Sequence, residues 1–280
     1  MSGFTIVATD RLSELVKRFV IKAPAIAAHA QPGQFVMLRL DETGERIPLT
    51  IAESDRANGT ITIIVQELGK TTTVLGQRGA GMSIPDILGP LGHPTPVNKV
   101  GTVVAMGGGV GVAEVYPVAR AYRDAGNRVV GIIGARTKNL IILENEMRSV
   151  CDELLVATDD GSYGHHGLVT VLLEETMKKQ PINLVYAIGP VPMMRAVAET
   201  TRASAIETIV SLNPIMVDGT GMCGACRVTV NGKTQFACVD GPEFNGHQVD
   251  WKELVSRLSM FKEHEQRSLH QHRAGCRYNI

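Results

Sequence analysis

The residues best suited to redox chemistry lie between Pro214 and Gly241, a stretch that holds three of the five cysteines in the chain. Their spacing is Asp218-x4-Cys223-x2-Cys226-x11-Cys238. If Asp218 is counted as a ligand, the run begins like the C-x4-C-x2-C pattern of plant-type [2Fe–2S] sites, with a carboxylate in the first place. Glycines among these residues would allow backbone amides to fold closely around an inorganic core. The pattern therefore favours an iron–sulfur site.

Three other sites compete for the same residues. A structural zinc site also uses Cys-x2-Cys closed by a hairpin, although three cysteines with one aspartate are uncommon. A disulfide leaves one cysteine unpaired and does not suit a chain without secretory features. A redox dithiol normally opens a helix, whereas Arg227–Val230 after the second cysteine has strand composition. We expect Asn231-Gly232 to form the tight turn of a hairpin that brings Cys238 back to the site.

A second group of residues predicts a nucleotide site. The apolar run Gly101–Met106 is followed by the glycines Gly107, Gly108, Gly109 and Gly111, and then by a helical pattern over residues 112–125. A strand, a glycine turn and a helix form the opening of a dinucleotide-binding fold, because glycine permits close backbone approach and the helix N-terminus favours phosphate. The run is not the strict G-x-G-x-x-G fingerprint.

The elements that position this turn alternate between strand and helix patterns as far as residue 212. We expect strands at residues 129–134, 154–158, 184–188 and 206–210, with helices at 139–150, 169–179 and 191–201. Ligands of such parallel sheets lie beyond the carboxyl ends of the strands. The candidate residues at those ends are Arg136, Asp159, Gly189 and Pro190.

The chain before Val97 has a different sequence pattern, in which short stretches rich in β-branched residues are separated by turn residues such as Pro32-Gly33 and Asn58-Gly59. Strands expected at residues 4–7, 15–21, 34–40, 49–51 and 60–66 indicate a small antiparallel barrel. The predicted fold class is thus an antiparallel barrel followed by a parallel-sheet α/β domain and a C-terminal cluster loop with a hairpin. Residues 1–97, 98–212 and 213–280 are the expected divisions. Beyond Trp251, apolar residues recur at helical spacing.

Composition narrows the class of protein. The 280 residues carry 28 basic and 28 acidic side chains, and 44 % of them are hydrophobic. This balance gives no indication of nucleic-acid or membrane binding. No signal-peptide pattern opens the sequence, so we expect a cytoplasmic protein. Cys151 and Cys276 are isolated cysteines, for which no functional role is predicted.

The barrel, the glycine turn and the cluster loop, in this order, resemble the ferredoxin reductase superfamily over nearly the whole chain. The sequence Gly107–Gly111, the turn Ile188–Pro190 and the cluster loop carry the resemblance. Within the superfamily the chain resembles the branch of the dihydroorotate dehydrogenase electron-transfer subunit. It resembles more strongly the small subunit of NADH-dependent reduced ferredoxin:NADP oxidoreductase, also described as the sulfide dehydrogenase beta subunit. Asp218 stands where dihydroorotate-type subunits have a first cysteine, and this departure points to the ferredoxin:NADP type, in which the resemblance implies ligation by aspartate.

The resemblance implies FAD, NAD(H) and a [2Fe–2S] cluster as cofactors, with Asp218, Cys223, Cys226 and Cys238 as cluster ligands. An Arg-x-Tyr-Ser-like motif would bind FAD, and Thr50 would tune the flavin. The residues expected to line the FAD site are Arg46, Pro48, Leu49, Thr50, Val65, Gly69, Lys70, Thr71 and Thr72. The implied activity is hydride exchange between NAD(H) and FAD with single-electron transfer, and electron bifurcation when the chain forms a heterodimer with a large NADP-binding flavin and iron–sulfur subunit. Ferredoxin would be a redox partner of that complex.

Two alternatives stay open at this point. One is the electron-transfer subunit of dihydroorotate dehydrogenase, and the other is a zinc-stapled regulatory module that binds a nucleotide. The choice between NAD and NADP is also open, because no acidic residue ends the second strand of the α/β part and Arg136 there suits a 2′-phosphate.

Overall fold

The computed structural model describes residues 3–42 and 44–276. Its N-terminal part consists of β1 (Phe4–Ser13), β2 (Val16–Lys22), α1 (Pro24–His29), β3 (Phe35–Arg39), β4 (Ile47–Thr50), β5 (Glu53–Asp55), β6 (Thr60–Gln66), α2 (Lys70–Gly76), β7 (Ser83–Ile84) and β8 (Asp86–Leu91). One antiparallel sheet has the strand order β5-β6-β2-β1-β7, and a second has the order β4-β3-β8. Phe19 and Ile21 alternate with exposed or half-buried neighbours on β2 and are fully buried between the sheets. The predicted antiparallel fold is confirmed.

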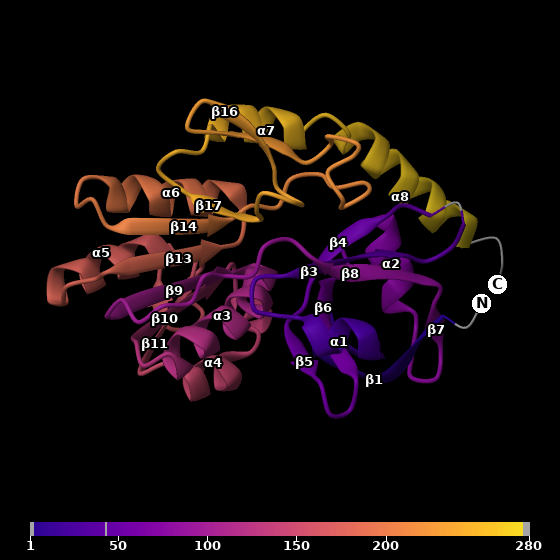
Figure 1. Ribbon diagram of the computed structural model, residues 1–280, viewed down its shortest axis with the longest axis horizontal. Coiled ribbons are helices and arrows are strands. Elements are labelled where there is room, and N and C mark those ends of the chain that lie inside the picture. Colours follow the sequence, from indigo (N-terminus) through magenta and orange to yellow (C-terminus); the bar gives the residue numbers. More distant parts are fainter. Residues whose placement is uncertain (1–2, 43, 277–280) are drawn as a thin grey trace.

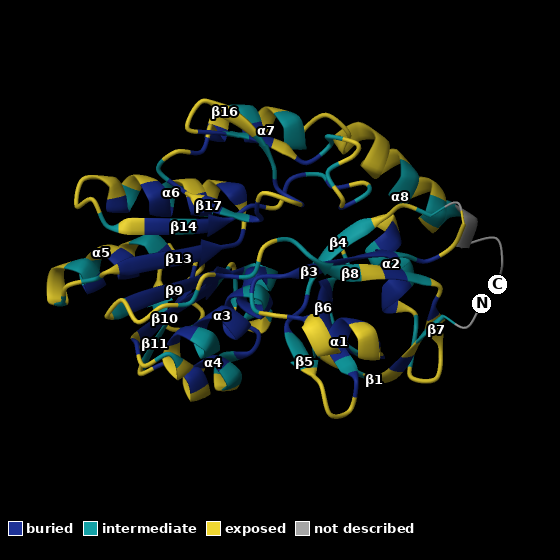
Figure 2. Ribbon diagram, viewed as in Figure 1, coloured by how far each residue is buried: buried dark blue, intermediate teal, exposed yellow. Residues whose placement is uncertain are grey.

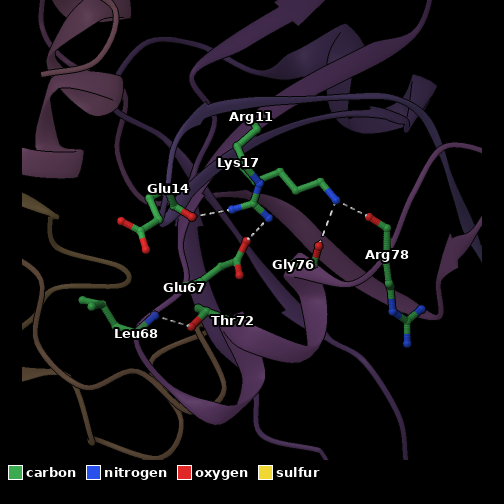
Figure 3. A network of polar contacts seen from close by, with 8 residues as sticks. All are labelled: Arg11, Glu14, Lys17, Glu67, Leu68, Thr72, Gly76 and Arg78. Carbon is green, nitrogen blue, oxygen red and sulfur yellow. Dashed lines mark hydrogen bonds and ion pairs between the residues drawn. The ribbon is translucent and has the colours of Figure 1, made fainter. Parts of the chain in front are cut away.

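Polar contacts hold α2 against the β1–β2 hairpin (Figure 3). Lys17 Nζ donates to the carbonyls of Gly76 and Arg78, at 2.8 and 2.7 Å, so a cation lies beside the C-terminal carbonyls of the helix. At the other end of α2, Thr72 Oγ1 accepts from the backbone N–H groups of Leu68 and Gly69, at 3.1 and 3.0 Å. The short helix α2 is therefore held at both of its ends.

The middle of the chain forms a mixed sheet that is parallel except at one edge. Its elements are β9 (Thr102–Gly108), η1 (Gly109–Gly111), α3 (Val112–Asp124), β10 (Arg128–Ala135), η2 (Lys138–Leu140), α4 (Glu144–Val150), β11 (Glu153–Thr158), β12 (His165–His166), α5 (Val169–Lys179), β13 (Leu184–Ile188), α6 (Val191–Arg202), β14 (Glu207–Ser211) and β17 (Glu243–Asn245). The strand order is β12-β11-β10-β9-β13-β14-β17, and β17 alone among these pairs antiparallel to its neighbour within the described chain. From β9 the chain adds β10, β11 and β12 on one side of the sheet, and it then returns to add β13 and β14 on the other side of β9. Open α/β sheets bind ligands at such a point, where the strand order reverses.

Helices cover both faces of this sheet, as Figures 1 and 2 show: the strands are buried and the outer helix faces are exposed. One face packs against α3 and α4, and the other against α5 and α6. The helix expected over residues 139–150 is wrong in its first half. The structure has a 3₁₀ turn there, and α4 begins only at Glu144, after Leu143 in a left-handed conformation (φ 54°).

The C-terminal part contains the hairpin of β15 (Arg227–Val230) and β16 (Lys233–Phe236), followed by α7 (Trp251–Leu258) and α8 (Lys262–Cys276). Asn231 and Gly232 have φ values of 51° and 70°, as the predicted tight turn requires. The apolar stripe of the tail is buried only at its start: Trp251 and Leu254 are buried, whereas Val255 is 49 % exposed. In Figure 1, α8 extends from α7 across to α2 of the N-terminal part.

Candidate flavin, nucleotide and cluster sites

The cluster loop brings two of the predicted ligands into contact. Cys226 and Cys238 are each 2 % exposed, and the Cys226 thiol donates to Cys238 Sγ at 3.2 Å. The hairpin causes this contact, because Ala237 N donates to Cys226 O at 3.1 Å and places Cys238 directly beside Cys226. Burial and the Cys226 contact raise the pKa of Cys238 to about 12. An ion that coordinates this thiol must therefore displace its proton, as thiolate-binding metals do.

The other two predicted ligands form a second pair on the same loop. Asp218 Oδ2 accepts from Cys223 N and Asp218 Oδ1 accepts from Thr220 N, both at 2.6 Å. The hydrogen bond from Thr220 N contributes most to holding the pKa of Asp218 below its usual range. Cys223 is exposed, and its Sγ accepts from Ala225 N at 3.4 Å. The carboxylate is thus ionised and fixed beside a cysteine, in a loop lined with backbone N–H groups.

These residues do not form a ready-made metal cage. Over the described part of the chain, no three His, Cys, Asp or Glu side chains are grouped closely enough to hold a single metal ion. The donor set nevertheless fits an iron–sulfur cluster, which takes anionic ligands and is stabilised by nearby N–H donors. A close thiol pair and an Asp–Cys pair lie on one loop, and the loop needs its glycines: a Cβ on Gly219 (φ 80°) would lie 2.5 Å from Met37 and 2.9 Å from Leu91 on the barrel.

The predicted nucleotide turn has the expected geometry. Gly107 and Gly108 end β9, η1 follows, and α3 begins at Val112. A Cβ on Gly111 would lie 2.6 Å from the carbonyl oxygen of Ile188, and a Cβ on Gly108 would lie 3.1 Å from Pro190. The glycine turn therefore packs against the predicted turn that contains Gly189 and Pro190.

Gly109 differs from its neighbours. It has φ 59°, and a Cβ there would meet nothing within 4 Å. Its backbone faces open space, which is what a bound pyrophosphate requires. Arg136 and Asp159 are exposed at the ends of β10 and β11, and Asp159 N donates to Ala135 O at 3.1 Å. All the predicted nucleotide residues thus lie along the carboxyl edge of the parallel sheet.

A cavity of about 420 Å³ lies where the barrel, the glycine turn and the cluster segment meet. Eight of the residues predicted for FAD line it, namely Pro48, Leu49, Thr50, Val65, Gly69, Lys70, Thr71 and Thr72. Arg46 is not among its lining residues; its guanidinium lies 3.9 Å from Asp86. The arginine of the predicted motif is therefore displaced from the cavity, consistent with its longer spacing from Thr50.

Other lining residues were not predicted. Asn213 and Met216 reach the cavity from the segment that leads to Asp218, and Glu265 reaches it from α8. Glu114, in the first turn of α3, is half-buried, and Thr50 is its side-chain hydrogen-bond partner. Desolvation raises the pKa of Glu114 to about 7, although the bond with Thr50 opposes the shift. In the sequence, a glutamate at this position signals no more than a favourable interaction with the helix dipole.

One further carboxylate joins the three parts of the chain. Glu243 Oε1 on β17 accepts from the hydroxyls of Thr95 and Tyr186, at 2.5 and 2.7 Å. Burial raises its pKa above the usual range, and its Oε2 is buried without a hydrogen-bond partner. Cys151 is buried behind the sheet, and burial raises its pKa to about 12, so it is an unreactive thiol. The side chain of Cys276 lies outside the described residues.

Comparisons with known proteins show which proteins this chain is similar to. The family profile of the iron–sulfur cluster binding domain of dihydroorotate dehydrogenase B matches residues 213–250. The electron transfer subunit homolog of dihydroorotate dehydrogenase B (NAD(+)) from Thermotoga maritima is 46 % identical over 260 residues, which cover 93 % of this chain and 92 % of the relative. The electron transfer subunit from Geobacillus thermodenitrificans is 34 % identical over 254 residues, covering 88 % and 96 %.

Solved structures give the same result. A chain from the structure of the NADH-dependent reduced ferredoxin-NADP oxidoreductase, a study of flavin-based electron bifurcation, has a TM-score of 0.92 and 44 % identity, covering 97 % of this chain and 98 % of that one. A cytochrome P450 reductase from Amycolatopsis shares the fold alone, with a TM-score of 0.62 at 18 % identity over 73 % of this chain and 66 % of that one.

The predicted oxidoreductase class and its cofactors, FAD, NAD(H) and a [2Fe–2S] cluster, are confirmed at the level of the family. Among the described residues, no helix combines the length and apolar character needed to cross a bilayer. Whole-length identity, the matching fold and the cluster segment together place this chain in the family of dihydroorotate dehydrogenase B-type electron-transfer subunits.

Proposed function

We propose that this chain is the electron-transfer subunit of a bifurcating NADH-dependent ferredoxin:NADP oxidoreductase. One observation carries the proposal: a single cavity is lined by the predicted flavin residues, by the glycine turn through Val110, and by the cluster segment through Met216. A redox group in this cavity would lie beside both the proposed NAD(H) site, from which electrons would come, and the proposed cluster site, to which they would go. The proposed divisions remain 1–97 for FAD, 98–212 for NAD(H) and 213–280 for the cluster.

The chain's own residues supply binding and orientation. When bound, FAD supplies the conversion between two-electron hydride chemistry and single-electron transfer. Thr50 and the loop from Gly69 to Thr72 would hold it from the barrel side, and the open backbone at Gly109 would receive the dinucleotide. Asp218, Cys223, Cys226 and Cys238 would hold the cluster.

The cluster loop also has the properties of a surface where electrons leave. Cys223 is exposed, and the exposed apolar side chains beside it include Met222 (88 %), Val217 (49 %) and Val239 (38 %). Small residues around them would allow another redox protein to approach closely. We propose that a large subunit carrying flavin, iron–sulfur clusters and the NADP site docks there to form a heterodimer, with ferredoxin as a redox partner of the complex.

Reconstitution tests this proposal. The isolated chain should oxidise NADH with artificial acceptors but should not couple NADPH oxidation to the reduction of both NAD and ferredoxin. Adding the large subunit should restore the coupled reaction. Coupled activity of the purified chain alone would contradict the proposal.

The second candidate is a dihydroorotate dehydrogenase B electron-transfer subunit, favoured by the family of the cluster segment and by the relatives' names. Asp218 in the first ligand position supports the bifurcating type instead, because the sequence resemblance implies a cysteine at this position in dihydroorotate-type subunits. Co-purification decides between them: a large subunit that oxidises dihydroorotate supports the second candidate, and one that binds NADP supports the first.

A further inference from the structure

Glu114 occupies an unusual place in the cavity. It follows Val110 by one helical turn, and both residues line the cavity from the glycine turn and the start of α3. Thr50, whose hydroxyl is expected beside the flavin, also lines the cavity and is the hydrogen-bond partner of Glu114. The carboxyl group therefore lies where the nucleotide turn and the flavin wall meet.

The surroundings of Glu114 leave its charge poorly compensated. Buried side chains from both parts of the molecule pack around the start of α3, including Ala52 from the barrel and Val112 and Val115 from the helix. The titratable groups around it are Tyr186 on β13, whose pKa is raised mainly by burial and in smaller part by the charges of Glu243 and Glu114, and the cavity-lining residues Glu45, Lys70 and Glu265. The last three are exposed, so water screens them.

We propose that Glu114 compensates charge in the cavity by binding a proton when negative charge builds up there. The inference rests on the proposed function. A flavin bound in this cavity would gain two electrons and one proton on accepting a hydride from NADH, with NAD⁺ as the other product, and would thereby add one negative charge to the cavity that Glu114 lines. A carboxylate in a half-buried wall opposes that charge, whereas a neutral carboxylic acid does not. Glu114 would take its proton from solvent and release it again when the electrons leave toward the cluster.

The desolvation that raises the pKa of Glu114 to about 7 supports this role, because the group then changes charge near neutral pH. Thr50 acts in the opposite direction, since its hydrogen bond stabilises the carboxylate. The pair would thus set the pH at which proton uptake begins, and the predicted flavin-tuning role of Thr50 would act partly through Glu114.

The test is the pH dependence of the flavin potential in the FAD-loaded full chain, measured by spectroelectrochemistry at the flavin absorption band. A two-electron couple shifts by about 30 mV per pH unit for each proton taken up, since a tenfold change corresponds to that value. Above neutral pH the native chain should show a slope of about twice this value, and Glu114→Gln should show about 30 mV per unit over the same pH range. Ionisation of the flavin itself is common to all variants, so the difference in slope isolates Glu114.

Two variants sharpen the result. Asp124→Asn removes an exposed carboxylate at the far end of the same helix and should leave the slope native. Thr50→Val should move the steep region to higher pH, because the carboxylate loses its hydrogen-bond donor. Equal slopes in the native chain and Glu114→Gln, with FAD bound in both, would overturn the inference and leave the proposed function intact. A native chain that binds no FAD would overturn the proposed function and this inference with it.

Discussion

Replacement of Gly109 by alanine tests the nucleotide turn, because Gly232 provides a matched control. Gly109 has φ 59° and Gly232, at the tip of the β15–β16 hairpin, has φ 70°. A Cβ at either position would meet nothing within 4 Å. Both alanine variants therefore carry the same cost, that of a left-handed backbone with a side chain, which is about 1–2 kcal/mol. Their unfolding free energies should fall equally.

The two variants should differ in nucleotide binding. At Gly109 the added methyl group occupies the space from which a pyrophosphate would contact the backbone, whereas the hairpin tip lies away from the glycine turn. We expect Gly109→Ala to weaken NADH binding by at least about tenfold, or about 1.4 kcal/mol. Gly232→Ala should bind NADH with native affinity.

Urea unfolding and NADH titration of the three proteins measure the two quantities separately. Flavin content should be native in both variants, because neither glycine lines the flavin cavity. Native NADH affinity in Gly109→Ala, with the expected loss of stability, would show that the dinucleotide binds elsewhere.

Three further substitutions have defined outcomes. The folded-state pKa of Glu114 is raised from 4.5 to about 7, so its contribution to stability is present below pH 4.5 and lost as the pH rises through 7. Glu114→Gln should therefore become more stable than the native chain at pH 8, by at most about 3 kcal/mol. A difference in unfolding free energy between the two proteins that is the same at pH 5 and at pH 8 would refute this. Tyr186→Phe removes a buried hydrogen bond to the Glu243 carboxylate and should lower the free energy of unfolding by about 2 kcal/mol in urea titrations, whereas a loss below about 0.5 kcal/mol would show that the bond is not needed. Asp218→Cys should retain the cluster and alter its potential and visible spectrum, since a sulfur donor replaces an oxygen donor; an unchanged spectrum would mean that Asp218 is not a ligand.

Local sequence signals were sufficient where one residue type has one physical use. Asn231-Gly232 predicted a hairpin turn because both positions require positive φ, and the structure has it. The glycine run that ends β9 predicted a turn that allows close backbone approach, and in the structure Gly108 and Gly111 pack closely against the turn that contains Gly189. In these cases the constraint lies in the backbone of the residue itself.

The remaining features depend on contacts between distant segments. Glu114 and Glu243 are ordinary acidic residues in the sequence, and they acquire raised pKa values only when the barrel and the cluster segment cover them. The end of α7 before Ser259 also coincides with a contact between distant segments: Arg257 donates to Ala225 O in the cluster loop at 3.0 Å, although the apolar spacing of the sequence continues past this point. Periodicity reports which face is apolar and does not report where the partner surface ends.

The most direct test of the account is anaerobic NADH titration of the purified chain followed by visible absorption and electron paramagnetic resonance. The account predicts flavin and iron–sulfur absorption bands in the oxidised protein and their bleaching by NADH. It also predicts a paramagnetic signal from the reduced cluster that is lost when Cys226 and Cys238 are both replaced by serine. A colourless chain that contains zinc, or a cluster that NADH cannot reduce through the flavin, would contradict it.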